Sequence, residues 1–240
     1  IERYRKEGRA VVNSAKPGLW ETPITYLHLE GYGRAMGVGY CAQGLTNAAR
    51  SYAFRSHAID VDQEDSDHSL KYVEMLKLGI DPEAEFPMFM KRLRNRSAWV
   101  DFLARYDGIS KKDAKRAFIA IANGGKLQSD VPFMRRLASD LTEINQRLVD
   151  ANQWVLEYFG ERSKPLISRA CAVISFKEAE LTASVAAALE REACSKEYCR
   201  IFDGAVVQCD TDSMRTRIDD VLQNISIQRR VPVRVKPWKA

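Results

Sequence analysis

The spacing of apolar positions along the chain predicts mostly helices. The clearest helical pattern covers residues 110–122. Ser110 is a good N-cap, Asp113 follows three residues later as in a capping box, and Gly124 can end the helix together with Gly125. The other predicted helices are 43–54, 66–78, 97–106, 130–159, 166–194 and 212–223.

Alternation of apolar and polar residues predicts a few strands between these helices. The predicted strands are 24–30, a turn and strand in 32–40, 56–62, the two arms of a hairpin in 198–209, and 230–236. The hairpin turn is assigned to Asp203 and Gly204, a dipeptide that suits a two-residue type I′ turn. Because long helical stretches separate the strands, the predicted fold class is α+β, a small antiparallel sheet covered on one side by helices.

Composition indicates a globular protein and excludes a disordered or fibrous one. The chain has 240 residues, of which 45% are hydrophobic and 29% charged. No apolar run approaches the roughly 18–20 residues that cross a bilayer, and the first residues lack the apolar stretch of a signal peptide. The chain begins with Ile, so the possibility that it is a processed fragment stays open. The 5 cysteines form no C-x-x-C and the 3 histidines no zinc pattern, so an intracellular, reduced protein is expected.

The net charge is only +5, but the charges are segregated along the sequence. An acid-rich block at 57–85 is followed by a base-rich block at 88–126. One interpretation is ordinary helix faces exposed to solvent. The other is a metal site beside an anion site.

Two aspartates stand at the end of the strand predicted over 56–62. Asp60 and Asp62 are two residues apart, so their carboxylates share one face of the strand. Carboxylates are costly to bury unless they are paired or bound to a cation. The pattern predicts a site for a hard cation such as Mg²⁺, with a solvated strand end as the plainer interpretation.

Asp203 stands at the tip of the predicted hairpin. An aspartate is common in turns, so this residue alone indicates little. If the hairpin lies beside the strand with Asp60, carboxylates from the two strands can hold two cations about 3.5–4 Å apart, as in-line phosphoryl displacement requires.

One face of the helix predicted over 110–122 carries a basic stripe. Lys111 and Lys115 are one turn apart, and Ile119 and Asn123 continue the same face. Two ammonium groups in this arrangement can bind a triphosphate as point charges. The alternative is a basic surface helix.

These three features follow the order of motifs A, B and C of family A DNA polymerases and the single-subunit phage-type RNA polymerases. The segment AIDVDQED resembles motif A, a strand that ends in a metal-binding aspartate, and RIFDGAVV is similar to motif C, a hairpin with the second metal aspartate. Lys111 and Lys115 fall on the basic positions of the motif B helix, and Asn123 and Gly124 on its eighth and ninth positions after the lysine. The whole pattern is most similar to compact polymerase-like palm proteins of viruses and mobile elements.

The resemblance implies a single polymerase-like unit over residues 1–240. It would have palm segments at about 24–80 and 166–240 and a fingers-like helical insertion at about 81–165. The implied activity is that of a template-directed nucleotidyltransferase, a nucleic-acid polymerase whose partners are primer–template and nucleoside triphosphates. The resemblance implies no membrane partner. It leaves open a larger replication or virion assembly as a partner.

The resemblance also implies roles for individual residues. Asp60, Asp203 and Asp62 would be catalytic and would hold two Mg²⁺ or Mn²⁺ ions. Asp65 is five residues beyond Asp60, where an acidic residue favours deoxynucleotides and hence a DNA polymerase. The residues implied to bind the nucleotide are Lys111, Lys115, Asp65 and Asn123.

Two departures from the pattern keep a second interpretation open. Asn123 stands where motif B has an aromatic residue, and Gly204 stands where motif C has a glutamate. A catalytically decayed palm would instead be a nucleic-acid-binding or assembly subunit. A D-x-D glycosyltransferase would need an α/β nucleotide-binding unit before Asp60, which the pattern does not predict. A metal-dependent nuclease would leave the lysine stripe without a role.

Overall fold

The computed structural model of the chain describes residues 47–125, 131–159, 166–201 and 204–238, with residues 45 and 129 and four short strands. These strands are β1 (Val11–Val12), β2 (Trp20–Glu21), β3 (Tyr26–His28) and β4 (Ala35–Gly37). β1 pairs with β2, and β3 with β4, in antiparallel fashion. The strands predicted in 24–30 and 32–40 are therefore confirmed in part.

A four-stranded sheet is the centre of the fold, with the strand order β6-β7-β5-β8. Its strands are β5 (Ala58–Gln63), β6 (Glu197–Ile201), β7 (Gly204–Gln208) and β8 (Val233–Lys236). Every pairing in it is antiparallel. Because β5 lies between β7 and β8, its neighbours come from the far end of the chain. The predicted α+β class with a small antiparallel sheet is confirmed.

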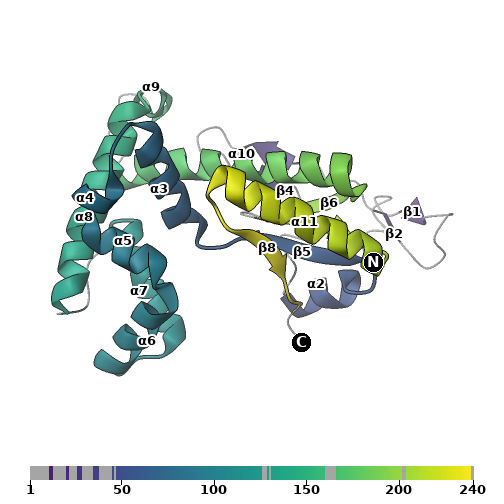
Figure 1. Cartoon of the computed structure of the whole chain (residues 1–240), viewed down its shortest axis with the longest axis horizontal. Coiled ribbons are helices and arrows are strands. Elements are labelled where there is room, and N and C mark those ends of the chain that lie inside the picture. Colours follow the sequence, from purple (N-terminus) through teal and green to yellow (C-terminus); the bar gives the residue numbers. More distant parts are fainter. Residues whose placement is uncertain are drawn as a thin grey trace.

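Two long helices, α10 (Leu166–Ala193) and α11 (Asp212–Arg229), pack against one face of the sheet (Figure 1). On β5, Ile59 and Val61 point into this core, where they join buried apolar residues of both helices. The opposite face is covered in part by Phe54 of α2 (Asn47–Phe54) and by Trp238. The alternation predicted for the strand with Asp60 and Asp62 is confirmed, because neither aspartate belongs to the apolar core.

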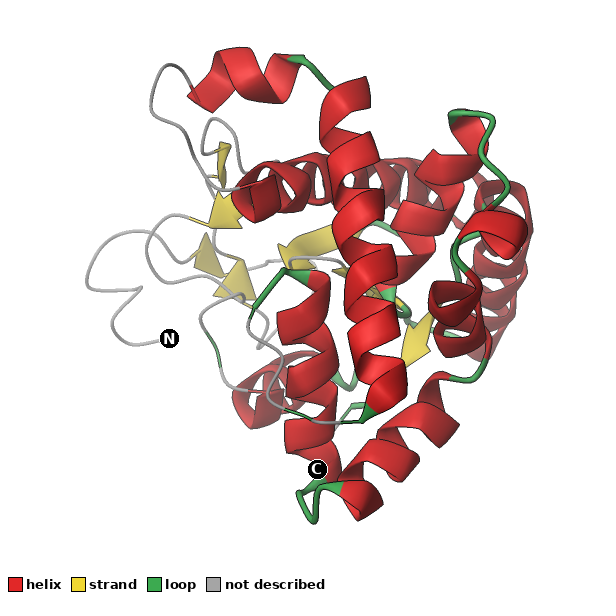
Figure 2. Ribbon diagram, turned by 90° about the vertical axis from the view of Figure 1, so that its left-hand side faces the viewer, coloured by secondary structure: helices red, strands yellow, loops and turns green. Residues whose placement is uncertain are grey.

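Between β5 and the rest of the sheet the chain forms a helical insertion, which lies at one end of the molecule (Figure 1) and faces the viewer in Figure 2. Its helices are α3 (Ser66–Lys77), α4 (Pro82–Glu85), α5 (Pro87–Arg94), α6 (Arg96–Tyr106), α7 (Lys111–Ala122), α8 (Pro132–Ala151) and α9 (Trp154–Phe159). Fully buried apolar side chains hold them together, among them Phe89, Phe118 and Leu141. No helix of the described residues is long and apolar enough to cross a membrane. α3 precedes the insertion predicted over about 81–165, and the boundaries near residues 80 and 165 stay a prediction.

The single helix predicted over 130–159 is wrong, because the chain forms α8 and α9 with a break at Asn152. The Asn152 side-chain amide donates to the Leu148 carbonyl at 2.8 Å, and that of Gln153 donates to the Asp150 carbonyl at 2.7 Å. Side-chain amides that bond nearby backbone groups in this way offer the chain an alternative to continuing the helix.

Three other boundaries differ from the predictions. Pro82 and Pro87 each begin a short helix that was not predicted, as suits a proline at the first helical position. α11 continues past residue 223 until Arg230, which adopts a left-handed conformation with φ 55°. Gly204 is the first residue of β7 rather than a turn residue.

Candidate functional site

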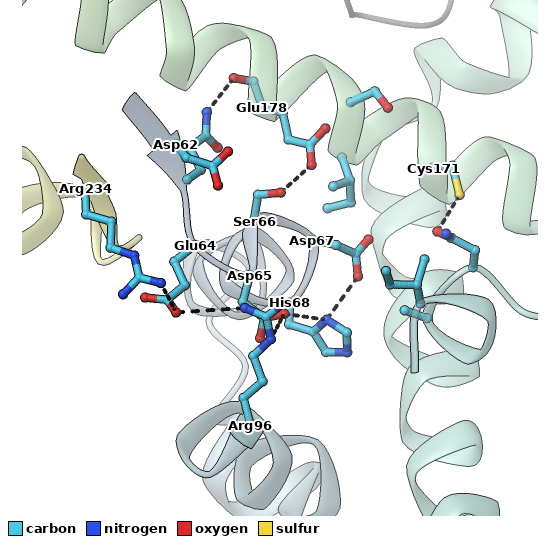
Figure 3. Close-up of a pocket in the computed structure, with 16 residues that line it drawn as sticks. Asp62, Glu64, Asp65, Ser66, Asp67, His68, Arg96, Cys171, Glu178 and Arg234 are labelled. Carbon is cyan, nitrogen blue, oxygen red and sulfur yellow. Dashed lines mark hydrogen bonds and ion pairs between the residues drawn. The ribbon is translucent and has the colours of Figure 1, made fainter. Parts of the chain in front are cut away.

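A pocket of about 520 Å³ lies where the end of β5 meets the end of α7 and the N-terminal half of α10 (Figure 3). Asp62 comes from β5, Asp67 from the first turn of α3, and Asn123 from the end of α7. Cys171 and Glu178 come from α10. Polar and acidic side chains from segments far apart in the sequence therefore converge on one cavity, which makes it the candidate functional site.

A second pocket, of about 690 Å³, adjoins the first. The residues common to both are Glu64, Asp65, Arg96 and Arg234. Lys111 and Lys115 of α7 line the second pocket, as do Arg94 and Arg230. The acidic pocket therefore continues into a pocket rich in cations, and the predicted metal site and anion site stay predictions.

The two aspartates of β5 share a strand face but differ in surroundings. Asp62 lines the first pocket, and its Oδ2 accepts a hydrogen bond from Nζ of Lys236 at 2.8 Å. Asp60 lies further back along the strand, opposite Lys236 in the β5–β8 register. Burial raises the pKa of Asp60, Lys236 counteracts this, and Asp62 adds to the rise. Asp62 is thus the member of the pair that faces the pocket, and the metal-binding roles of both stay predictions.

Asp203 lies outside the described residues, but the strands on either side of it are described. Ile201 pairs with Gly204 across the hairpin, and Gly204 pairs with Asp62 of β5. The hairpin therefore lies directly beside the strand that carries Asp60, as the two-metal hypothesis requires. The position of the Asp203 carboxylate, and its role, stay predictions.

Asp65 is held in an ion-pair cluster between the sheet and the helical insertion. It has a left-handed conformation with φ 54° and accepts from both terminal nitrogens of Arg92, one at 3.0 Å, with Arg96 at 3.5 Å. Burial raises its pKa, but the positively charged side chains around it outweigh this and the net shift is downward. An ionised Asp65 thus links the end of β5 to α5 and α6, and its predicted nucleotide-binding role is untested.

His68 is a packing residue. It is buried, and its ring stacks on that of Phe89 with centroids 5.8 Å apart. Its Nδ1 lies 3.5 Å from Asp67 and 3.7 Å from Asp65. Burial, and then the charge of Arg92, hold the pKa of His68 well below its ordinary value, so the ring is neutral at pH 7.

The stripe on α7 divides between the two pockets. Lys111 and Lys115 line the basic pocket, whereas Ile119 and Asn123 line the acidic one. Nζ of Lys111 lies 2.8 Å from Asp101, which leaves Lys115 as the more available cation. The predicted helix and its capping are confirmed, since Ser110 accepts from the Asp113 amide at 3.1 Å. The predicted nucleotide contacts of Lys111, Lys115 and Asn123 are untested.

Two buried charged residues near the pocket were missed in the sequence. Lys71, with 1% of its surface exposed, donates to Asp67 at 2.9 Å and to the Ala122 carbonyl at 3.0 Å, so it ties α3 to the end of α7. Glu178, also buried, accepts from the Ser66 hydroxyl at 2.6 Å (Figure 3). The signal in the sequence that could have revealed both residues is a charged residue among the apolar positions of a predicted helix.

The donor chemistry of the pocket suits a hard divalent cation in part. Asp62 offers carboxylate oxygen to the cavity, and Asp60 lies on the same strand face. Within the described part of the chain, no three acidic, histidine or cysteine side chains gather closely enough to hold a metal. Mg²⁺ is often held by only one or two carboxylates, with water and substrate phosphates as the other ligands. Asp62, Asp60 and Asp203 stay the predicted ligands of such an ion.

Comparisons with known proteins identify the fold. No known protein-family model matches the sequence, and no curated protein matches it. The structure is similar to that of the POL domain of Pol1 from M. smegmatis, solved in complex with DNA primer-template and dNTP, with a TM-score of 0.50 and 11% sequence identity. The match covers 93% of this chain and 48% of that chain, so this chain spans about half the length of its structural neighbour. The chain has a helix-rich, polymerase-like α+β fold with a palm-like sheet and a fingers-like helical insertion.

Proposed function

We propose that the chain is a template-directed nucleotidyltransferase, a DNA polymerase that adds nucleotides to a primer. The observation that carries the proposal is the joining of two pockets on a polymerase-like fold. The first contains Asp62, the second contains Lys111 and Lys115, and both include Glu64 and Asp65. A nucleoside triphosphate needs both kinds of pocket. Its α-phosphate reacts at metal ions held by carboxylates, and its leaving phosphates are stabilised by cations.

In this proposal the carboxylates of Asp62, Asp60 and Asp203 hold two Mg²⁺ or Mn²⁺ ions. Such ions, when bound, lower the pKa of a primer 3′-hydroxyl and neutralise charge on the triphosphate. Lys115, with Lys111 beside it, stabilises the negative charge that builds on the leaving pyrophosphate.

Two further residues complete the proposed nucleotide site. Asn123 ends α7 at the wall of the acidic pocket, where the sulfhydryl of Cys171 lies 3.1 Å from its Oδ1. Asp65, fixed by its arginine partners, lines both pockets. In this proposal its carboxylate restricts the space for the sugar of the incoming nucleotide. This position supports the preference for deoxynucleotides.

Primer extension tests the proposal. We expect the full chain to extend a labelled primer on its template with dNTPs in the presence of Mg²⁺ or Mn²⁺. Asp62→Asn and Asp203→Asn should each lower the rate by more than about 100-fold. Asp219→Asn is the matched control, because Asp219 is an exposed aspartate on α11 whose partner is Arg215. No extension by the wild type, or equal extension by all four proteins, would contradict the proposal.

One observation favours a second candidate, a palm that binds nucleic acid without catalysis. Several carboxylates at the pocket are already neutralised by cations of the chain, including Asp62 by Lys236, Glu64 by Arg234 and Asp67 by Lys71. A non-catalytic palm predicts nucleic-acid binding that is unchanged in EDTA and no incorporation of any nucleotide. The extension assay and an EDTA titration of binding distinguish the two candidates.

A further inference from the structure

The last strand of the sheet places a lysine against both aspartates of β5. Lys236 lies opposite Asp60 in the β5–β8 register, and its Nζ reaches diagonally to Oδ2 of Asp62 at 2.8 Å. Its charge also acts on Asp60, where it opposes the effect of burial. One ammonium group therefore serves two carboxylates that share a strand face.

The ammonium group of Lys236 supplies positive charge next to Asp60 and Asp62, as a bound cation would. Burial disfavours the charged form of Asp60, and the neighbouring charge of Asp62 adds to this effect, so both raise the pKa of Asp60. A positive group near both carboxylates offsets this cost. Arg234, two residues earlier on β8, forms the equivalent pair with Glu64 at 2.8 Å. The outward face of β8 thus supplies cations to the acidic end of β5.

The Lys236–Asp62 pair is also able to open. The side chain of Lys236 is 44% exposed and that of Asp62 is 25% exposed, so water can solvate both groups when they separate. An ion pair that is partly open to water is weaker than a buried one, and the flexible stem of a lysine can move aside without displacing the backbone. A divalent cation that approaches Asp62 from the pocket therefore competes with a weak partner.

We propose that Lys236 is a built-in counter-ion that competes with a divalent cation for Asp62 and swings away when the cation binds. The inference rests on the proposed function, because it takes Asp62 to be the metal-binding carboxylate. Its consequence is that the ammonium group lowers the metal affinity of the site in the absence of nucleotide and nucleic acid. The sheet keeps its charge balance without metal, since the lysine returns to Asp62 when the cation leaves.

The test measures Mn²⁺ binding to the full chain by electron paramagnetic resonance, without primer or nucleotide. Lys236→Met keeps the apolar stem and removes the charge, and we expect it to bind Mn²⁺ about tenfold more tightly than the wild type, as removal of a competing unit charge near the site allows. Lys177→Met is the matched control, because Lys177 is a lysine on α10 paired with Glu180 at 3.1 Å. It should bind Mn²⁺ as the wild type does.

Adding Asp62→Asn to Lys236→Met should abolish the gain in affinity. An unchanged or weaker affinity in Lys236→Met, or a gain that survives Asp62→Asn, would overturn the inference. Lys236→Gln is measured alongside, and thermal unfolding in EDTA shows that the variants are folded.

Failure of this inference is distinguishable from failure of the proposed function. Tighter Mn²⁺ binding without primer extension refutes only the polymerase activity, whereas extension with unchanged Mn²⁺ affinity refutes only the role of Lys236.

Discussion

Gly204 lies directly opposite Asp62 in the ladder between β5 and β7. A Cβ atom at position 204 would overlap the carbonyl oxygen of Val61, so the two strands approach each other at a point where only glycine fits. The glycine that follows Asp203 is therefore required by the packing of the strands rather than by a turn. This contact also fixes where the hairpin stands relative to the Asp62 carboxylate.

Gly204→Ala should destabilise the chain, because the added methyl group must push β7 away from β5. The expected loss in the free energy of unfolding is about 1–3 kcal/mol, the usual cost of overpacking a well-packed site. Urea denaturation followed by circular dichroism measures it. A wild-type denaturation midpoint in the variant would show that the strands can separate at no cost.

Lys71→Met should destabilise the contact between α3 and α7. The substitution removes the charged donor to Asp67 and to the Ala122 carbonyl while filling a similar volume, and the expected loss is about 2 kcal/mol. Lys177→Met, which breaks an exposed pair, should change stability by less than about 0.5 kcal/mol. Equal unfolding midpoints for the two variants would mean that the buried lysine contributes no more than a surface one.

Stability should fall in mild acid because of His68. Its pKa in the folded chain lies well below the ordinary 6.5, so below pH 6.5 the unfolded chain takes up a proton that the folded chain does not. Unfolding is then favoured as the pH falls. Asp65, whose pKa is also lowered, adds a loss in the same direction below its ordinary value of 3.8.

His68→Phe removes the titrating group but keeps a ring that can stack on Phe89. The difference in unfolding free energy between about pH 7.5 and about pH 5.5 should be smaller in this variant than in the wild type. Urea midpoints at the two pH values measure the difference. The same pH dependence in both proteins would assign the acid sensitivity to other groups.

The sequence predicted the elements whose signals are local. α7 is the clearest case, because Ser110 caps its start and Gly124 follows its end with φ 63°. The break at Asn152 was missed because it depends on which backbone carbonyl accepts a hydrogen bond from each side-chain amide. Periodicity within 130–159 carries no information about that choice.

The sequence allowed a prediction of which kinds of residue form the site, but not of which side chains contact each other there. Strand alternation placed Asp60 and Asp62 on one face, and the two-metal hypothesis required the hairpin to lie beside them, as it does in the β5–β7 register. The partner of Asp62 was not predictable, because Lys236 is 174 positions away and reaches it through the β5–β8 pairing. Glu178 meets Ser66 in the same long-range way, across 112 positions. Sequence patterns give the face of an element, whereas the register of distant segments decides which side chains meet.

The role of the basic pocket can be tested with two neighbouring lysines of α7. Lys115 lines that pocket, whereas Lys112 is exposed on the same helix and lines neither pocket of the candidate site. If Lys115 stabilises charge on the leaving phosphates, Lys115→Met should lower kcat/KM for dNTP incorporation by roughly 100-fold. Lys112→Met should leave it near the wild-type value although it removes the same charge.

The comparison separates a specific contact from the general attraction of a basic helix for a polyanion. A general attraction acts over a Debye length of about 8 Å at physiological salt and would make the two variants equally defective, with defects that disappear as salt is raised. A specific contact predicts a defect confined to Lys115→Met that persists in high salt. Steady-state extension kinetics at two salt concentrations measure both quantities, and equal behaviour of the two variants would remove Lys115 from the proposed nucleotide site.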